Sequence, residues 1–313
     1  MDELHLPSAL ESSQSVLVAG AGGGFDIYAG LPMYERLRSL GKKVFLANLS
    51  FVNLATTDAQ PLTRGLYAVK PTTTGQDWYF PERSLAQFLA RREQNIRIYA
   101  FERLGVAPIR EGYAHLVHSL SLDAIVLVDG GTDILLRGDE AGLGTPVEDM
   151  ASLAAVAAMN VPTRIVACVG FGIDAYHGVC HANWLENVAA LTAEGAFLGA
   201  IAFLRRMPEV RLYLDAVYAA DMRTYCPSIV NGSIVSAIEG RFGDYHRTRQ
   251  TQGSTLFINP LMSLLWAFDL AAVARRNLYL HRLADTETSS DIHLAIEQFY
   301  ETMARRPRQT IPH

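Results

Sequence analysis

The sequence predicts an α/β fold in which a mostly parallel sheet is flanked by helices. Through residues 1–187, short apolar runs alternate with segments of helical periodicity, which is the pattern of successive β-α-β units. Three of these runs end in glycines followed by an aspartate, so one kind of strand end occurs three times. Helical periodicity dominates residues 188–313. We therefore expect a Rossmann-like core followed by a mainly helical C-terminal layer packed on it, either as a second part or within one single domain.

The first strand and its turn occupy residues 16–26, Val-Leu-Val-Ala-Gly-Ala-Gly-Gly-Gly-Phe-Asp, and a helix is predicted over 27–40. Glycines at the N-terminus of a helix leave backbone N–H groups accessible, and the helix dipole favours negative charge there. The turn therefore predicts a site for a phosphate group. The residues expected to bind it are Gly20, Gly22, Gly23, Gly24 and Asp26.

This turn does not match the dinucleotide-binding pattern G-x-G-x-x-G. The third glycine of that pattern would stand at position 25, which is Phe25. An acidic residue that contacts the ribose would end the next strand, 44–49, where the sequence has Asn48 and then Ser50. Both differences disfavour NAD, so another nucleotide or phosphorylated small molecule is the expected ligand.

An irregular segment and three regular elements precede the second turn. Residues 53–81 are rich in Thr, Pro and Gly and contain several aromatic residues. A lid or specificity loop and a surface hairpin that buries its own aromatic side chains are both compatible with this composition. A helix over 81–90, a strand over 96–101 and a helix over 109–120 follow.

The second turn follows an apolar run over 125–128 and begins Asp129-Gly-Gly-Thr-Asp133, with further charged residues as far as Glu140. Carboxylates at the carboxyl end of a strand can hold a divalent cation such as Mg²⁺, and Arg137 can bind a phosphate or carboxylate. The plainer alternative is that these are ordinary turn residues and that Asp133 caps a helix. The expected cofactor-binding residues are Gly130, Gly131, Thr132 and Arg137, and the expected metal ligands are Asp133, Asp139 and Glu140.

The third turn follows an apolar run over 165–169, contains Asp174 and leads to His177 and His181. Two histidines four residues apart could bind a transition metal if they lay on one helix. A predicted helix start at Trp184 instead leaves both in a loop. A histidine here is better suited to act as a general acid or base, because imidazole titrates near neutral pH. The residues expected to carry catalysis are Asp129, Asp133, Asp174 and His177.

The rest of the chain is predicted to be mostly helical. Thr145-Pro-Val-Glu148 matches a capping box at the start of a helix, and the tail from Arg305 is expected to be solvated and frayed. The predicted helices cover 145–159, 188–206, 208–222, 228–239, 261–275 and 289–305, with one strand over 254–260.

Composition limits the class of protein. Half of the 313 residues are hydrophobic, which suffices for a large core, and the net charge of −5 with scattered basic pairs lacks the footprint of a nucleic-acid binder. Three cysteines without metal-type spacing argue against a disulfide framework and a structural zinc site. Residues 1–13 do not resemble a signal peptide, and the apolar run over 188–204 is interrupted by Glu194. We expect a cytoplasmic protein that binds neither nucleic acid nor membrane and could form a homo-oligomer.

Three stretches make the chain resemble the family known as domain of unknown function 1152 (DUF1152) over nearly its whole length. They are the glycine run that ends in Asp26, the segment from Asp129 to Glu140, and Asn259-Pro with Trp266-Ala-Phe-Asp-Leu. Phe25 stands where the resemblance leads us to expect a glycine, and it narrows the first turn. The resemblance implies a full-length α/β fold and supplies no activity.

These features predict a small-molecule enzyme that binds a nucleotide or another phosphorylated ligand at its glycine-rich strand ends. Hydrolysis or group transfer suits an acidic cluster beside an anion site better than hydride transfer does. The alternative is a non-catalytic sensor or effector subunit that binds a nucleotide, because one scaffold hosts both functions. Each hypothesis requires Asp26, Asp133 and Asp174 to meet around one pocket.

Overall fold

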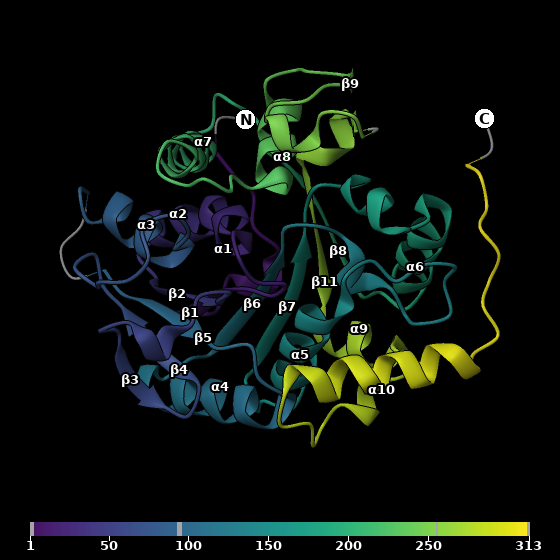
Figure 1. Cartoon of the computed structure of the whole chain (residues 1–313), viewed down its shortest axis with the longest axis horizontal. Coiled ribbons are helices and arrows are strands. Elements are labelled where there is room, and N and C mark those ends of the chain that lie inside the picture. The colour runs from purple at the N-terminus through teal and green to yellow at the C-terminus, as the bar shows by residue number, and fades with distance from the viewer. Residues whose placement is uncertain (1–2, 93–95, 255, 312–313) are drawn as a thin grey trace.

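In the computed structural model, which describes residues 3–92, 96–254 and 256–311, a mixed sheet runs through the centre with helices on both faces (Figure 1). This confirms the predicted α/β fold, including helices contributed by the C-terminal part. Within the described residues the sheet has nine strands. In chain order they are β1 (Ser15–Gly20), β2 (Lys43–Leu49), β3 (Gln60–Thr63), β4 (Leu66–Val69), β5 (Ile98–Phe101), β6 (Ala124–Asp129), β7 (Thr163–Cys168), β8 (Phe197–Ala202) and β11 (Leu264–Asp269).

The order of strands across the sheet is β3-β4-β5-β2-β1-β6-β7-β11-β8. The five strands from β5 to β7 are parallel. The chain proceeds from β1 to β2 and β5 on one side and then returns to β6 and β7 on the other, so the order reverses between β1 and β6. Ligands of open α/β sheets bind outside the carboxyl ends of the strands at such a reversal. The three glycine-and-aspartate turns follow β1, β6 and β7 and therefore lie at this edge.

Both faces of the sheet are buried under helices. In β1, Val16 and Val18 pack under one helical layer, whereas Leu17 and Ala19 pack under the other. The first layer contains α1 (Asp26–Ala29), α2 (Leu31–Ser39), α3 (Pro81–Leu89), α7 (Pro208–Asp221) and α8 (Ile229–Ile238). The second contains α4 (Val106–Leu120), α5 (Pro146–Ala157), α6 (His181–Ala193), α9 (Leu270–Arg276) and α10 (Ser289–Thr302) (Figure 1).

The irregular segment 53–81 has two parts. Its first part forms the hairpin β3-β4, and β4 pairs antiparallel with β5, so the hairpin extends the sheet. Its second part passes beside the first glycine turn, where the hydroxyl of Tyr79 lies 2.8 Å from the position that a Cβ on Gly24 would take. The hairpin prediction therefore holds for the first part, and the second part lies next to the predicted site.

The helix predicted over 188–206 is right as far as Ala193, where α6 ends, and wrong beyond it, because residues 197–202 form β8. Helix α6 ends at Ala193, and Gly195 then adopts φ +70°, a conformation that commonly terminates a helix. The apolar residues that follow suit a strand as well as a helix, so periodicity alone did not separate the two.

The helix predicted over 261–275 is wrong in its first half. Residues 264–269 form β11, which pairs antiparallel with β7 and with β8. Aromatic and aliphatic side chains alternate there, as suits a strand between two packed layers. Asp269 ends the strand by accepting a hydrogen bond from the amide of Ala272 at 2.8 Å, which caps α9. Strands β8 and β11, from beyond residue 188, thus belong to the same sheet as β1.

Smaller differences concern element ends. The strand expected over 254–260 is limited to β10 (Phe257–Ile258), which pairs with β9 (Gly243–Asp244). Thr145 makes no side-chain cap at the start of α5. Cys168, Cys180 and Cys226 are free thiols. In the described part of the chain, no helix combines the length and apolarity that crossing a bilayer requires.

Candidate functional site

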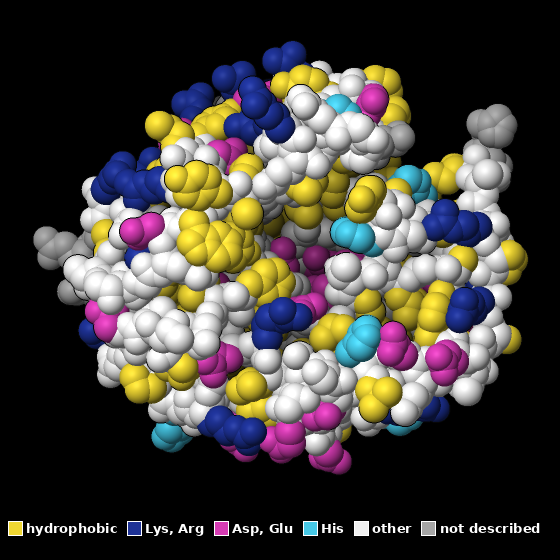
Figure 2. Space-filling view, viewed as in Figure 1, with side chains coloured by type: hydrophobic (Ala, Val, Ile, Leu, Met, Phe, Trp, Pro, Cys, Tyr) yellow, Lys and Arg dark blue, Asp and Glu magenta, His cyan; other side chains and the backbone are white. Residues whose placement is uncertain are grey.

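Five aspartates gather at the carboxyl edge of the sheet, and Figure 2 shows acidic side chains at the bottom of a hollow on this face. We call this group the acidic cluster. It includes the three aspartates whose convergence was predicted, one from each glycine turn. Its members are Asp26 at the start of α1, Asp129 at the end of β6, Asp133 in the turn after β6, Asp149 in the first turn of α5 and Asp174 in the turn after β7.

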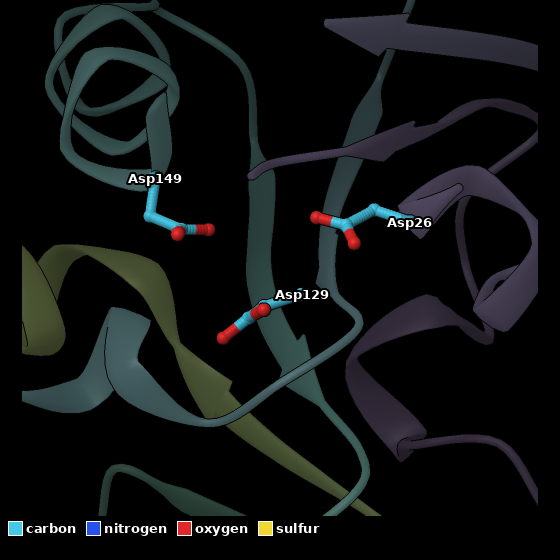
Figure 3. Close-up of side chains that lie close together, drawn as sticks. All are labelled: Asp26, Asp129 and Asp149. Carbon is cyan, nitrogen blue, oxygen red and sulfur yellow. The ribbon is translucent and has the colours of Figure 1, made fainter. Parts of the chain in front are cut away.

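Asp26, Asp129 and Asp149 form the tightest part of the acidic cluster. One carboxylate oxygen from each lies within 4.8 Å of the other two. Figure 3 shows the three side chains pointing toward one another from α1, β6 and α5. Oxygen ligands in this arrangement could hold one divalent cation such as Mg²⁺. Oδ1 of Asp149 is buried and has no hydrogen-bond partner among the described residues, so it is an acceptor left available for such a cation.

Asp133 and Asp174 are held in place by hydrogen bonds to the backbone. Oδ2 of Asp174 accepts bonds from the amide of Thr132 at 2.7 Å and from its hydroxyl at 3.1 Å. The indole Nε1 of Trp184 donates to the carbonyl of Thr132 at 2.8 Å, which fixes the same turn. Oδ2 of Asp133 accepts a bond from the amide of Thr145 at 2.7 Å and so closes the loop between η3 (Asp133–Leu135) and α5.

The glycines of the turns make room for these carboxylates. A Cβ on Gly22 would lie 2.9 Å from both carboxylate oxygens of Asp149, and one on Gly130 would lie 2.7 Å from Oδ1 of Asp26. Real Cβ atoms do not approach oxygen this closely, so any side chain at either position would displace the cluster. Close approach of carboxylates therefore accounts for these two glycines.

The expected phosphate site formed by glycine amides is not open. The amide of Gly22 donates to Oδ2 of Asp26 at 2.7 Å, and the amide of Gly24 donates to the carbonyl of Leu49 at 3.1 Å. Gly20 is the last residue of β1. Acceptors within the chain thus already occupy two of the donors that we assigned to phosphate.

Burial raises the pKa of all five aspartates. For Asp26 it raises the pKa from 3.8 to about 7, against the opposing effect of hydrogen bonds from backbone amides, the largest from Gly22. For Asp129 and Asp149, burial and the charges of neighbouring aspartates raise the pKa well above its ordinary value. Among the described residues, no lysine or arginine is ion-paired with these three carboxylates. The site is therefore short of positive charge.

A cavity of about 460 Å³ opens beside the acidic cluster. Asp174 and His177 line it, so two of the residues predicted to carry catalysis face the same space. His177 ends the 3-10 turn η4 (Ile173–His177), whereas His181 begins α6, so the two histidines do not share a helix face. Burial raises the pKa of Asp133, against the opposing effects of backbone hydrogen bonds, the larger from Thr145, and of the nearby His177.

Asp139 and Glu140, expected as metal ligands, lie outside the acidic cluster. Nη2 of Arg306 lies 2.9 Å from an oxygen of each, and Arg137 lies 3.3 Å from Asp139. Glu140 also accepts a bond from Nδ2 of Asn187 at 2.7 Å. Arg306 belongs to the tail that we expected to be frayed, and it forms ion pairs with both carboxylates. Asp139 and Glu140 therefore have a structural role.

The sequence model of the DUF1152 family, described as a protein of unknown function, matches residues 17–302. The chain belongs to the DUF1152 family. The matched region runs from β1 into α10 and contains the whole acidic cluster. No curated protein and no solved structure matches this DUF1152 chain.

Asp149 is the member of the acidic cluster that our sequence interpretation missed. It stands next to Glu148, which we assigned to a capping box, in the first turn of α5. The hydroxyl of Ser152 donates to the carbonyl of Ala21 at 2.8 Å and ties α5 of the DUF1152 chain to the first turn. The available signal was an acidic residue in the first turn of a helix that follows an aspartate-rich loop.

A further carboxyl group, that of Glu82, is buried behind the first glycine turn of the DUF1152 chain. Its Oε1 accepts a bond from Nδ2 of Asn48 at 2.7 Å, and the same Nδ2 donates to the carbonyl of Gly24 at 2.8 Å. Oε2 of Glu82 has no partner within the described residues. Burial raises the pKa of Glu82 from 4.5 to about 7, against the opposing effect of the Asn48 bond.

We expect Glu82→Gln to stabilise the DUF1152 protein at pH 8 by about 3 kcal/mol. Because the folded-state pKa is raised above the unfolded value, Glu82 favours folding below pH 4.5 and this contribution is lost as the pH rises through about 7. Urea unfolding at pH 4 to 8 measures the difference, which should nearly vanish at pH 4. The exposed control Glu301→Gln should follow the wild type at every pH. If the unfolding free energy of Glu82→Gln depended on pH in the same way as that of the wild type, the prediction would be contradicted.

Proposed function

We propose that the protein is an enzyme that uses a divalent cation to hydrolyse or transfer a phosphorylated group of a small molecule, with nucleotides as the leading class of substrate. The observation that carries the proposal is the Asp26, Asp129 and Asp149 group, which lies at the reversal of strand order beside a cavity. Buried carboxylates repel one another, and binding of a cation would relieve this repulsion.

Phosphate would reach this site through the cation. Mg²⁺ is typically bound by one or two protein carboxylates together with substrate phosphates, which explains how an anion can enter an acidic site. Such a cation would neutralise charge on the phosphate and orient it for attack. The proposal therefore assigns Asp26, Asp129 and Asp149 to the cation, in place of the expected glycine amides.

His177 and Asp174 are the groups proposed to move protons. Both line the cavity beside the acidic cluster. His177 is exposed at the cavity, so its imidazole can reach a substrate and exchange protons with water. Asp174 is fixed by Thr132 and is better placed to orient a water molecule or a substrate hydroxyl group.

The experiment is a phosphate-release assay on a panel of nucleotides and sugar phosphates with Mg²⁺ or Mn²⁺. We expect turnover that EDTA abolishes and that the double variant Asp129→Asn/Asp133→Asn lacks, because this variant loses one of the three cation ligands. The control variant Asp285→Asn, at an exposed position far from the acidic cluster in the sequence, should keep full activity. Cation-dependent binding without turnover on any compound would instead indicate a sensor or effector subunit.

A further inference from the structure

We propose that the cavity beside the acidic cluster binds a neutral heteroaromatic ring, so that the substrate is a nucleotide with its base in the cavity and its phosphate at the cation site. This inference rests on the proposed function and specifies its substrate. It follows from the chemistry of the cavity wall, of the loop opposite to it and of the end that meets the acidic cluster.

The wall of the cavity is mainly apolar, with four aliphatic side chains and the exposed ring of Tyr176. Ile173 lies in the turn after β7, Ile229 and Val230 begin α8, and Leu256 precedes β10. Branched aliphatic side chains from three separate elements form a surface on which a flat ring can pack, as in pockets that hold an unstacked base. A sugar phosphate alone would leave this apolar surface in contact with water.

The distribution of charged groups along the cavity determines the orientation of the ligand. Among the described residues that line the cavity, Asp174 and His177 lie at the end near the acidic cluster, Tyr176 is a neutral phenol, and neither a lysine nor an arginine is present. A phosphate group deep in the cavity would therefore lack a positive partner. The phosphate is stabilised only at the end where a cation can bind, so the uncharged part of the ligand occupies the interior.

The loop that faces the aliphatic wall supplies uncharged hydrogen-bonding groups from Gln250, Thr251, Gln252 and Ser254. The hydroxyl of Ser254 already donates to the carbonyl of Thr251 at 2.7 Å, and the hydroxyl of Thr251 lies 2.9 Å from Nδ1 of His246. The side-chain amide of Gln252 has no such bond among the described residues. An amide both donates and accepts, which suits the edge of a base and would be unused by an alkyl chain.

A hydrogen bond fixes the position of the cavity wall relative to the first glycine turn. Nδ2 of Asn231, the third residue of α8, donates to the carbonyl of Phe25 at 3.1 Å, and Ser228 caps the same helix. Asn231 thus links the helix that carries Ile229 and Val230 to the turn that carries Asp26. A volume of about 460 Å³ lies within the range of small-molecule sites.

The test is calorimetric titration with Mg²⁺ of the four ribonucleoside 5′-monophosphates, ribose 5-phosphate and the four nucleosides without phosphate. We expect at least one nucleotide to bind about ten-fold or more tightly than ribose 5-phosphate. Ile229→Trp fills the cavity from a residue that is 41% exposed and should remove this advantage without changing the affinity for ribose 5-phosphate. Leu261→Trp, at a residue that is 43% exposed and away from this cavity, should change neither.

Gln252→Leu should reduce the differences in affinity among the four nucleotides. If ribose 5-phosphate binds as tightly as every nucleotide, or if Ile229→Trp leaves nucleotide affinity unchanged, the inference is overturned and the proposed function stands. If no phosphorylated compound shows cation-dependent binding, the proposed function fails and the nucleosides decide the inference. Nucleoside binding that is abolished by Ile229→Trp would then support a base site in the cavity. If no nucleoside bound, the inference would be overturned as well.

Discussion

Replacing Asp149 by asparagine is expected to stabilise the cation-free protein and to remove its stabilisation by Mg²⁺ or Mn²⁺. Burial and the nearby charges of Asp133 and Asp26 raise the pKa of Asp149, so the folded state bears a cost for this carboxyl group that an amide would not bear. The free energy of unfolding in EDTA should increase by on the order of 2 kcal/mol, as is common when a destabilising functional residue is neutralised.

The same substitution removes one of the three oxygen ligands. At a free cation concentration of one hundred times the dissociation constant, the wild type should gain about 2.7 kcal/mol of stability. At the same cation concentration, a variant that binds the cation one hundred-fold more weakly should gain only about 0.4 kcal/mol of stability. Chemical unfolding with EDTA and with added Mn²⁺ measures both effects for Asp149→Asn.

Glu148→Gln provides a matched control on the same turn of α5. Glu148 pairs with Arg103 at 2.7 Å and is not one of the three clustered carboxylates, so this variant should keep the cation-dependent gain. Loss of stability in cation-free Asp149→Asn, or an undiminished response to Mn²⁺, would show that the three aspartates do not form a cation site.

Arg306→Ala is expected to cost about 3 kcal/mol of folding free energy, the lower end of the range for breaking a buried ion pair. Nη2 of Arg306 lies 2.9 Å from Glu140, whose side chain is fully buried, and its Nε donates to Asp139 at 2.9 Å. Removing the guanidinium leaves Glu140 with Nδ2 of Asn187 and two backbone amides as donors. Urea unfolding at neutral pH measures the loss.

The adjacent Arg305 offers a comparison of similar chemistry at an exposed position. It stacks over the ring of Tyr300 with its guanidinium carbon 4.0 Å from the centroid, and Arg305→Ala should cost less than about 1 kcal/mol. The double variant Arg306→Ala/Glu140→Gln should recover part of the loss, because no buried charge then lacks its partner. Equal effects of the two arginine substitutions would mean that the tail does not stabilise the fold.

The convergence of Asp26, Asp133 and Asp174 could be predicted from the sequence for a simple reason. Each follows an apolar run that ends in glycine, and the carboxyl ends of parallel strands share one edge of a sheet. The pairing of β1 with β6 and of β6 with β7 then places the three turns side by side. A repeated local pattern was sufficient because the sheet itself supplies the long-range geometry.

Asp149 and the partners of Glu140 could not be predicted in the same way. Asp149 reaches the acidic cluster only because α5 packs against the turn after β1, where the hydroxyl of Ser152 donates to the carbonyl of Ala21. Arg306 lies 166 residues from Glu140 in the chain, and nothing near either residue indicates the other. Helix packing and tail placement depend on the assembled core, so local periodicity carries no information about them.

The position of β11 has a consequence for how the protein is made. This strand lies between β7 and β8, although it leaves the ribosome long after both. A nascent chain that ends after α8 would have the parallel core from β5 to β7, but β8 would have no neighbour and the open side of β7 would be exposed to pairing with other chains. Completion of the sheet is therefore a late event in synthesis, in which β11 joins two segments that were synthesised before it.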